Sequence, residues 1–144
     1  MAANREATGL VVVRLFLGVF FLFQGLGKLG WLLKSDGISR ALTEYAQQAN
    51  AWNAWFLQSV ALPYQEIFAR LVVLGELSCG VALLAGLFTR TAGLLGFLMV
   101  LSFHFASGAL FRFGFLTLGT GLPVLGGLLA LAIGAGRLPW SVRG

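Results

Sequence analysis

Charge is scarce in this sequence. Only 10 Lys/Arg and 5 Asp/Glu occur among 144 residues, whereas 58% of the chain is hydrophobic and its mean hydropathy is +0.89. Soluble domains are about 25% charged, so this composition excludes an ordinary soluble domain and predicts a protein embedded in lipid. The cations, which leave a net charge of +5, are spread singly along the chain. Without a basic cluster, nucleic-acid binding is excluded as well.

Cysteine and histidine are almost absent. Cys79 is the only cysteine, which excludes an intrachain disulfide, a C-x-x-C redox pair and a thiolate cluster. His104 is the only histidine, so one chain cannot supply two histidines to a haem or three to a metal ion. We therefore predict no metal site, and any redox role needs a cofactor or partner from outside the chain.

Long uncharged stretches are present instead. No charge occurs between Arg90 and Arg112 or between Arg112 and Arg137, and a spanning helix needs ~20 apolar residues. Two further apolar stretches contain isolated charges. A cleaved signal peptide is the competing interpretation of the N-terminus, but Arg14 interrupts its apolar run and no A-x-A-like site follows. We predict one all-α membrane domain over residues 1–144, with spans at about 9–33, 67–88, 91–111 and 115–136.

The connections between the predicted spans indicate their arrangement. Those near 89–90 and 111–114 are short, which favours an up-down-up-down bundle of four transmembrane helices with both termini on one side. Lys/Arg residues in short loops favour the cytoplasmic side. We therefore expect an integral protein of the bacterial cytoplasmic membrane with both termini in the cytoplasm. The cations on the terminal side are Arg5, Arg90, Arg137 and Arg143, against Lys34, Arg40 and Arg112 on the other.

The long connection between the first two spans has a helical pattern of its own. Apolar residues recur there at spacings of three and four, which predicts an amphipathic helix that begins near Ser35 or Asp36. We expect the segment of about 35–62 to lie at the membrane interface. Aromatic residues on this side predict a headgroup-level belt, or alternatively a lid over a cavity or a docking face. The periodic residues are Ile38, Leu42, Tyr45, Ala49 and Trp52, and the aromatic residues are Trp31, Trp52, Trp55 and Tyr64.

Small residues repeat every four positions in two spans. Gly126, Ala130 and Gly134 do so in the last span, and Ala82 and Gly86 in the second. Such strips allow two helix backbones to approach closely, so we predict that they pack helices within the bundle. Pro123 lies among glycines and predicts a kink near the middle of the membrane.

Polar residues within the predicted spans need a reason, because burial of a charge in a bilayer is costly. Counted at ~1.5 Å per residue from the cytoplasmic ends, Glu76, His104 and Gln24 fall at depths of roughly 18, 20 and 21 Å. Lys28 and Arg70 both fall at roughly 27 Å. The five residues are therefore candidates for one polar cluster. Arg14, at only roughly 6 Å, is expected to extend to the lipid phosphates.

Three interpretations of this cluster remain open. The cluster can be interpreted as a buried network that fixes helix register, as a site for the headgroup of a quinone or lipid, or as a proton path. The quinone interpretation rests on a carboxylate and an imidazole beside a lipid-accessible crevice, since quinone chemistry moves protons with electrons. The sequence assigns no catalytic residue and identifies no cofactor, quinone being the candidate.

Motifs in the first two spans resemble those of the DoxX family of small four-helix membrane proteins. The first is RLFLG at 14–18, continuing to GLGK at 25–28; the second is GELSCG at 75–80, followed by GLFTR at 86–90. The resemblance implies a membrane subunit that works with other proteins in electron transfer. Because cysteine pairs are lacking, a disulfide-exchange role is not expected.

These observations lead to two functional hypotheses. The first is a membrane subunit of a redox complex that offers a quinone or lipid site around Glu76 and His104, with membrane lipids and other subunits of that complex as partners. The alternative is a structural or assembly subunit that fills a seam in a larger complex. A solute transporter is less supported, because four spans are few unless the protein oligomerises.

Overall fold

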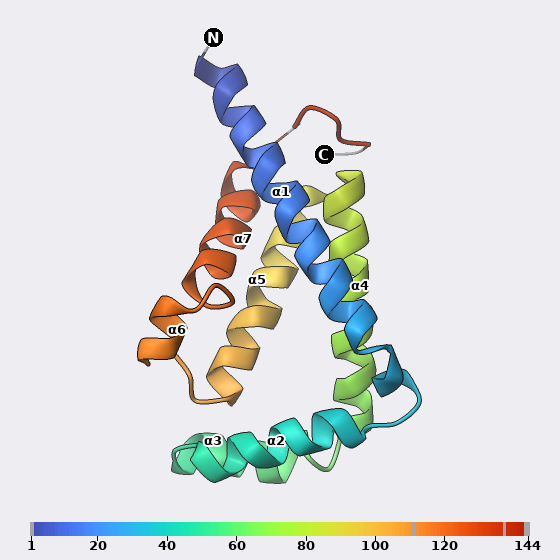
Figure 1. Cartoon of the computed structure of the whole chain (residues 1–144), viewed down its shortest axis with the longest axis vertical. Coiled ribbons are helices and arrows are strands. Elements are labelled where there is room, and N and C mark those ends of the chain that lie inside the picture. Colours follow the sequence, from blue (N-terminus) through green and yellow to red (C-terminus); the bar gives the residue numbers. More distant parts are fainter. Residues whose placement is uncertain (1, 111, 137, 143–144) are drawn as a thin grey trace.

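Four helices run along the length of the molecule. The computed structural model describes residues 2–110, 112–136 and 138–142, and these contain helices and loops but no strand. Figure 1 shows that the direction of the chain alternates from one long helix to the next, so that α1 begins and α7 ends at the same end of the molecule. The four helices are α1 (Ala2–Gly27), α4 (Gln65–Ala85), α5 (Thr89–Ala106) and α7 (Leu122–Gly134).

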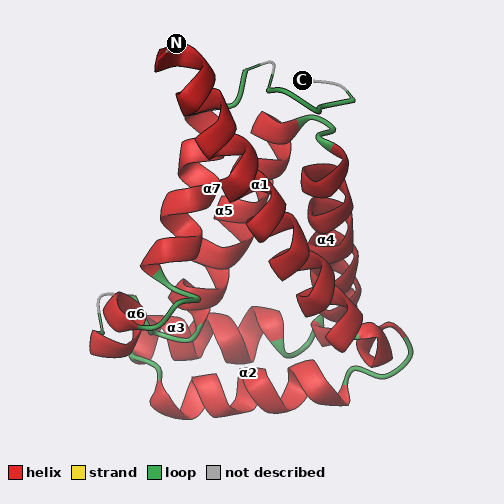
Figure 2. Cartoon of the chain, turned by 45° about the horizontal axis from the view of Figure 1, so that its top comes forward, coloured by secondary structure: helices red, strands yellow, loops and turns green. Residues whose placement is uncertain are grey.

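The opposite end is crossed by the connection between α1 and α4. It comprises the 3-10 turn η1 (Leu29–Leu32), α2 (Asp36–Gln48), α3 (Ala51–Phe56) and the π-helical turn η2 (Leu57–Ala61). Figure 2 shows α2 and α3 lying across the ends of the long helices. Within α2, Ile38 and Leu42 are buried, as the helical spacing predicts.

The amphipathic helix is shorter than its apolar pattern. α2 ends at Gln48, and Asn50 starts a new helix by accepting a hydrogen bond from the Asn53 backbone N–H at 3.0 Å. Trp52 therefore belongs to α3, where it stacks on Trp55 and is 64% exposed. The N-cap chemistry of asparagine interrupts a periodicity that, by itself, predicted one continuous helix.

Among the described residues, three helices are long and apolar enough to cross a membrane: Arg5–Gly27, Gln65–Ala85 and Thr89–Ala106. The predicted span at 115–136 is instead divided into α6 (Phe113–Thr117) and the 13-residue α7. The break lies at 118–121, where glycines accumulate, and Pro123 stands in the first turn of α7. Proline is favourable at that position because its missing N–H needs no partner there. The expected kink at Pro123 is thus a helix start.

The ends of the other spans also differ from the prediction by a few residues. α1 stops at Gly27, so Lys28 stands in the turn that follows. α4 ends at Ala85 and is capped by Gly86, which adopts a left-handed conformation (φ 66°) that permits the Leu87 N–H to bond back to the Ala82 carbonyl. Hydropathy marks an apolar stretch, but backbone conformation decides where its helix ends.

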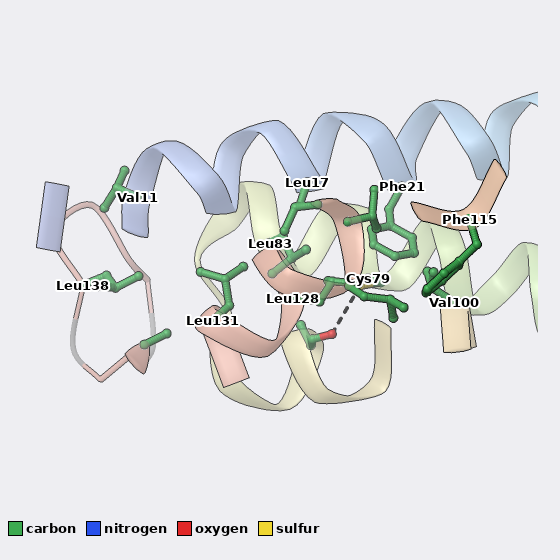
Figure 3. Close-up of a cluster of buried hydrophobic side chains, with 14 residues drawn as sticks. Val11, Leu17, Phe21, Cys79, Leu83, Val100, Phe115, Leu128, Leu131 and Leu138 are labelled. Carbon is green, nitrogen blue, oxygen red and sulfur yellow. Dashed lines mark hydrogen bonds between the residues drawn. The ribbon is translucent and has the colours of Figure 1, made fainter. Parts of the chain in front are cut away.

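Glycines bring α1 and α4 into close contact. A Cβ atom at Gly80 would lie 2.6 Å from the backbone nitrogen of Leu22, and one at Gly25 would lie 3.0 Å from the backbone nitrogen of Leu77. Figure 3 shows the core that these helices form with α5 and α7, including Phe21, Leu83 and Leu128. Cys79 lies in this core and its thiol donates to the Ala92 carbonyl. The core holds α1 against α4 at the level of their polar residues.

Candidate functional site

An ion pair joins the end of α1 to the middle of α4. The Lys28 Nζ atom lies 2.7 Å from Oε1 and 2.8 Å from Oε2 of Glu76, and 3.0 Å from Oε1 of Gln24. The Glu76 side chain is 6% exposed and that of Lys28 22%. Gln24 and Lys28 are one helical turn apart, so the ammonium group meets both acceptors at once. The structure thus brings together three of the five residues that the sequence proposes for one cluster.

Trp31 covers this ion pair from the side of α2. Its ring centroid lies 5.9 Å from Lys28 Nζ, within the range of a cation–π contact. The indole also lies directly against Gly37 in the first turn of α2, where a side chain on Gly37 would collide with it. The sequence placed Trp31 in an aromatic belt. Its position beside Lys28 depends on how η1 folds back after Gly27. The spacing of apolar residues in the sequence does not predict the path of this turn.

A cavity of about 560 Å³ lies beside the ion pair. It is enclosed by α1, α4 and α5 and by the crossing segment of α2 and η2. Its wall is mostly apolar and aromatic, and includes Phe21, Phe56, Phe68, Met99 and Phe103. The polar side chains on the wall are few: Gln24, Lys28, Trp31, Tyr45, Glu76, Ser102, His104 and Thr120. A space of this size and composition suits a small amphipathic ligand.

His104 lies on the same wall but is bonded elsewhere. Its Nε2 atom is 2.9 Å from the backbone carbonyl of Thr120, and its ring meets Phe115 edge-on at a centroid distance of 5.0 Å. The Thr120 carbonyl belongs to the break before α7, where the helical ladder does not satisfy it. His104 thus supports that break while its ring borders the cavity. It also borders an adjacent cleft of about 240 Å³ near Arg112.

Arg70 is not brought to this cluster. It pairs with Glu66 at 3.4 Å and its side chain is 55% exposed. Six residues of helix separate Arg70 from Glu76, which at ~100° per residue places them on different faces of α4. The depth of a residue in the membrane fixes its level but not the direction in which it points.

Arg14 is buried instead of extending to the lipid phosphates. It is only 1% exposed, and its guanidinium donates to the Ser141 hydroxyl and, at 3.1 Å, to the Trp140 carbonyl. Its Nε atom is buried without a hydrogen-bond partner in the described part of the chain. The segment after α7 folds over this arginine. No pattern in the sequence predicts this contact, because the two segments are 126–127 residues apart.

The small residues divide between outer and inner surfaces. Gly126 and Ala130 lie on an exposed face of α7, and nothing comes within 4 Å of a Cβ atom placed on Gly126. Gly134 approaches Leu10 of α1, and Ala82 packs against the core. Gly86 acts as the C-cap of α4. Gly126 and Ala130, two of the three residues of the strip on α7, therefore remain available to another helix.

Metal ligands do not gather in the described residues. No group of three or more His, Cys, Asp or Glu side chains lies close enough there to hold a metal ion. The site consists of an ion pair, an amide, an imidazole and an aromatic wall.

Comparison with known proteins identifies the family. The family model for DoxX matches residues 9–109. The chain belongs to the DoxX family. The matched region contains the ion pair, Trp31, His104 and the whole crossing segment of this DoxX protein. No curated protein and no solved structure matches the chain. Family membership and three apolar helices together identify an integral membrane protein.

Proposed function

We propose that this DoxX protein is a membrane subunit of a redox complex and that it holds the headgroup of a quinone in the cavity beside Lys28 and Glu76. The observation that carries the proposal is a buried ion pair on one wall of an otherwise apolar cavity of about 560 Å³. Ligand sites typically combine an apolar wall with a few polar groups that orient the ligand. A quinone, with a flat ring and two polar oxygens, matches that division.

The unfilled space argues against a purely structural role of the ion pair. Protein interiors are packed as densely as organic crystals, and a pair that only fixed helix register would be enclosed by side chains. Here the pair borders open volume that also reaches Trp31 and His104.

We also propose the placement of this molecule in the membrane. α1, α4 and α5 each cross it, and α6 with α7 forms a fourth, discontinuous crossing, since α7 alone rises only ~20 Å against a hydrocarbon core of ~30 Å. α2 and α3 lie at the membrane surface, with the exposed Trp52 and Trp55 in the headgroup layer. Both termini are cytoplasmic and the membrane is that of a bacterial cell, which puts the cavity nearer the outer face.

Purification from the native membrane tests the proposed ligand. The protein is extracted in mild detergent, and quinones in the organic extract are quantified by mass spectrometry relative to total phospholipid. We expect quinone to be enriched over its ratio in the whole membrane. Ala41→Trp should abolish the enrichment, because Ala41 lines the cavity from α2 and a large side chain there occupies its volume. Thr43→Trp, on an exposed position of the same helix, is the matched control.

Two results would oppose the proposal. Quinone at the membrane's own ratio in the wild-type extract would show that the cavity does not select it. Enrichment of one phospholipid that is lost in Ala41→Trp would identify a lipid headgroup site instead. Co-purifying proteins, identified in the same sample, report whether the chain belongs to a redox complex.

A second candidate function is that of an assembly subunit without chemistry of its own. The exposed strip of Gly126 and Ala130 on α7 favours it, because small residues permit a helix of another chain to approach closely. Gly126→Leu should then release partner subunits during purification. If partners are lost in Gly126→Leu and quinone is not enriched in the wild type, the assembly function is supported and the quinone site is not.

A further inference from the structure

The hydrogen-bonding groups at the cavity differ in how much capacity they have left. Lys28 has three ammonium hydrogens, and three acceptors lie within 3.0 Å of its Nζ atom: both carboxylate oxygens of Glu76 and Oε1 of Gln24. Lysine has no acceptor of its own. The strongest donor at the site is therefore already fully engaged and offers nothing further to a ligand.

Glu76 retains acceptor capacity. An ionised carboxylate has about four lone-pair positions, and Lys28 occupies one on each oxygen. Within the described residues, no other donor reaches these oxygens. Glu76 also lines the cavity, so a ligand there can donate to an oxygen that carries negative charge. Hydrogen bonds to ionised groups are about twice as strong as those between neutral groups.

The contact of His104 fixes its tautomer. A backbone carbonyl can only accept, so the Nε2 atom, 2.9 Å from the Thr120 oxygen, must carry a hydrogen. In the neutral imidazole the other nitrogen, Nδ1, is then an acceptor. The charged groups that face the cavity with His104 are Lys28 and Glu76, and Arg112 lies across the adjacent cleft. A neutral His104 on this wall thus has one acceptor nitrogen, Nδ1.

The remaining donors are neutral. They are the Gln24 amide, the Trp31 indole N–H and the hydroxyls of Tyr45 and Thr120, for none of which a donated hydrogen bond is found in the described residues. The Ser102 hydroxyl donates to the Leu98 carbonyl. The charged group that keeps hydrogen-bonding capacity at this wall is therefore an acceptor, the Glu76 carboxylate, and the donors that remain form only the weaker neutral hydrogen bonds. A quinone has two carbonyl oxygens and only accepts, whereas a quinol has two hydroxyl groups that each donate.

We propose that the cavity binds the reduced, hydroxyl-bearing form of its ring ligand, a quinol, in preference to the oxidised quinone. This inference rests on the proposed function and specifies its ligand. The ring hydroxyls donate to the Glu76 carboxylate and to Nδ1 of His104. The oxidised form has no ring hydroxyl, so in the same position its carbonyl oxygens face both acceptors and are repelled by them.

Binding of a matched set of ring ligands tests the inference. The purified protein in lipid nanodiscs is titrated without oxygen by calorimetry, with empty nanodiscs as the blank. The probes are durohydroquinone, duroquinone, and the dimethyl ether of durohydroquinone, in which both oxygens remain but neither can donate. We expect durohydroquinone to bind about tenfold or more tightly than the other two, as a gain of one charge-assisted hydrogen bond requires.

Variants of Glu76 and His104 test whether these two acceptors cause the preference for the quinol. Glu76→Gln removes the charge and presents amide hydrogens, so the preference for the quinol should fall to about threefold or less. Glu66→Gln changes an exposed carboxylate of the same helix and should leave it unchanged. His104→Phe keeps a ring against Phe115 but removes Nδ1, and should weaken the binding of durohydroquinone alone.

The outcomes separate this inference from the proposed function. Equal or tighter binding of duroquinone would overturn the inference and leave the quinone site in place. Binding of the dimethyl ether as tight as that of durohydroquinone would show that shape, not donation, selects the ligand, and would also overturn it. Failure of all three probes to bind would overturn both proposals.

Discussion

Lys28 and Glu76 carry opposite charges into a largely apolar interior, so neither is replaceable by itself. The carboxylate is 6% exposed and receives two short bonds from one ammonium group. The desolvation of such a pair is costly, and removal of one partner leaves the other as an uncompensated charge. Replacement of one partner alone should therefore destabilise the protein more than replacement of both by apolar residues.

Variants of Glu76 measure that dependence. We expect Glu76→Ala to lower the free energy of unfolding by ~3 kcal/mol because it leaves Lys28 without a counter-charge, and Glu76→Gln by only ~1–2 kcal/mol because an acceptor remains. The double variant Lys28→Met with Glu76→Leu should cost less than Glu76→Ala, since no charge is left unpaired. Denaturation in detergent, followed by circular dichroism, checks this order.

The exposed pair of Arg70 and Glu66 on the same helix supplies the control. Arg70→Gln should change stability by less than ~0.5 kcal/mol, because surface ion pairs contribute little. If Glu76→Ala were as harmless as Arg70→Gln, the ion pair with Lys28 would not be formed in the folded protein.

Arg14 holds the segment that follows α7. Its guanidinium bonds to Ser141 and to the Trp140 carbonyl, near the αL cap that ends α4. Arg14→Gln should release this segment, so that chymotrypsin cleaves after Trp140 several-fold faster than in the wild type. Ser141→Ala removes only one acceptor and should have a smaller effect, worth ~1 kcal/mol. Equal cleavage rates in the wild type and Arg14→Gln would exclude the anchoring role.

At the scale of elements, α1 and α4 are held together where glycines remove side chains between them. A Cβ atom at Gly80 would meet backbone atoms of Leu22 at 2.6 and 2.8 Å, and a backbone cannot move aside as a flexible side chain can. The same contact sets the level at which Lys28 faces Glu76. A change at Gly80 should therefore disturb both stability and the site.

Gly80→Ala tests this helix contact. We expect a loss of ~1–3 kcal/mol in the free energy of unfolding from overpacking, accompanied by weaker ligand binding in the cavity. Gly126→Ala in α7 is the matched control, since open space surrounds that position. It should be neutral or stabilise by up to ~1 kcal/mol, because alanine favours the helix. A destabilised Gly126→Ala with an unaffected Gly80→Ala would reverse the assigned helix faces.

At the scale of the molecule, the crossing segment lies at one end, and the start of α1 and the end of α7 lie at the other (Figure 1). This separation makes the proposed orientation testable with one reagent. In a Cys79→Ser background, Gln47→Cys on α2 should react with an impermeant maleimide added to intact cells, and Glu6→Cys on α1 should not. Both positions are exposed in the structure. Reaction of Glu6→Cys alone would place the crossing segment in the cytoplasm.

The sequence by itself determined the class of the protein and most of its elements. Scarce charge and long apolar stretches predict membrane helices because unpaired charges are costly in lipid. The motifs around Arg14 and Glu76 predicted the DoxX family, which the family match confirms. Residue depth brought Gln24, Lys28 and Glu76 to neighbouring levels, since the rise of a helix is constant.

Only the tertiary structure decided in which direction each polar side chain points and which distant segments contact one another. The rotation of α4 turns Arg70 away from Glu76, and the break before α7 engages His104 with the Thr120 carbonyl. The fold of η1 places Trp31 beside Lys28. Periodicity cannot supply these contacts, because they depend on helix rotation, helix ends and chain segments far apart in sequence. The same contacts leave the acceptors of Glu76 and His104 beside the cavity while the donors of Lys28 are engaged.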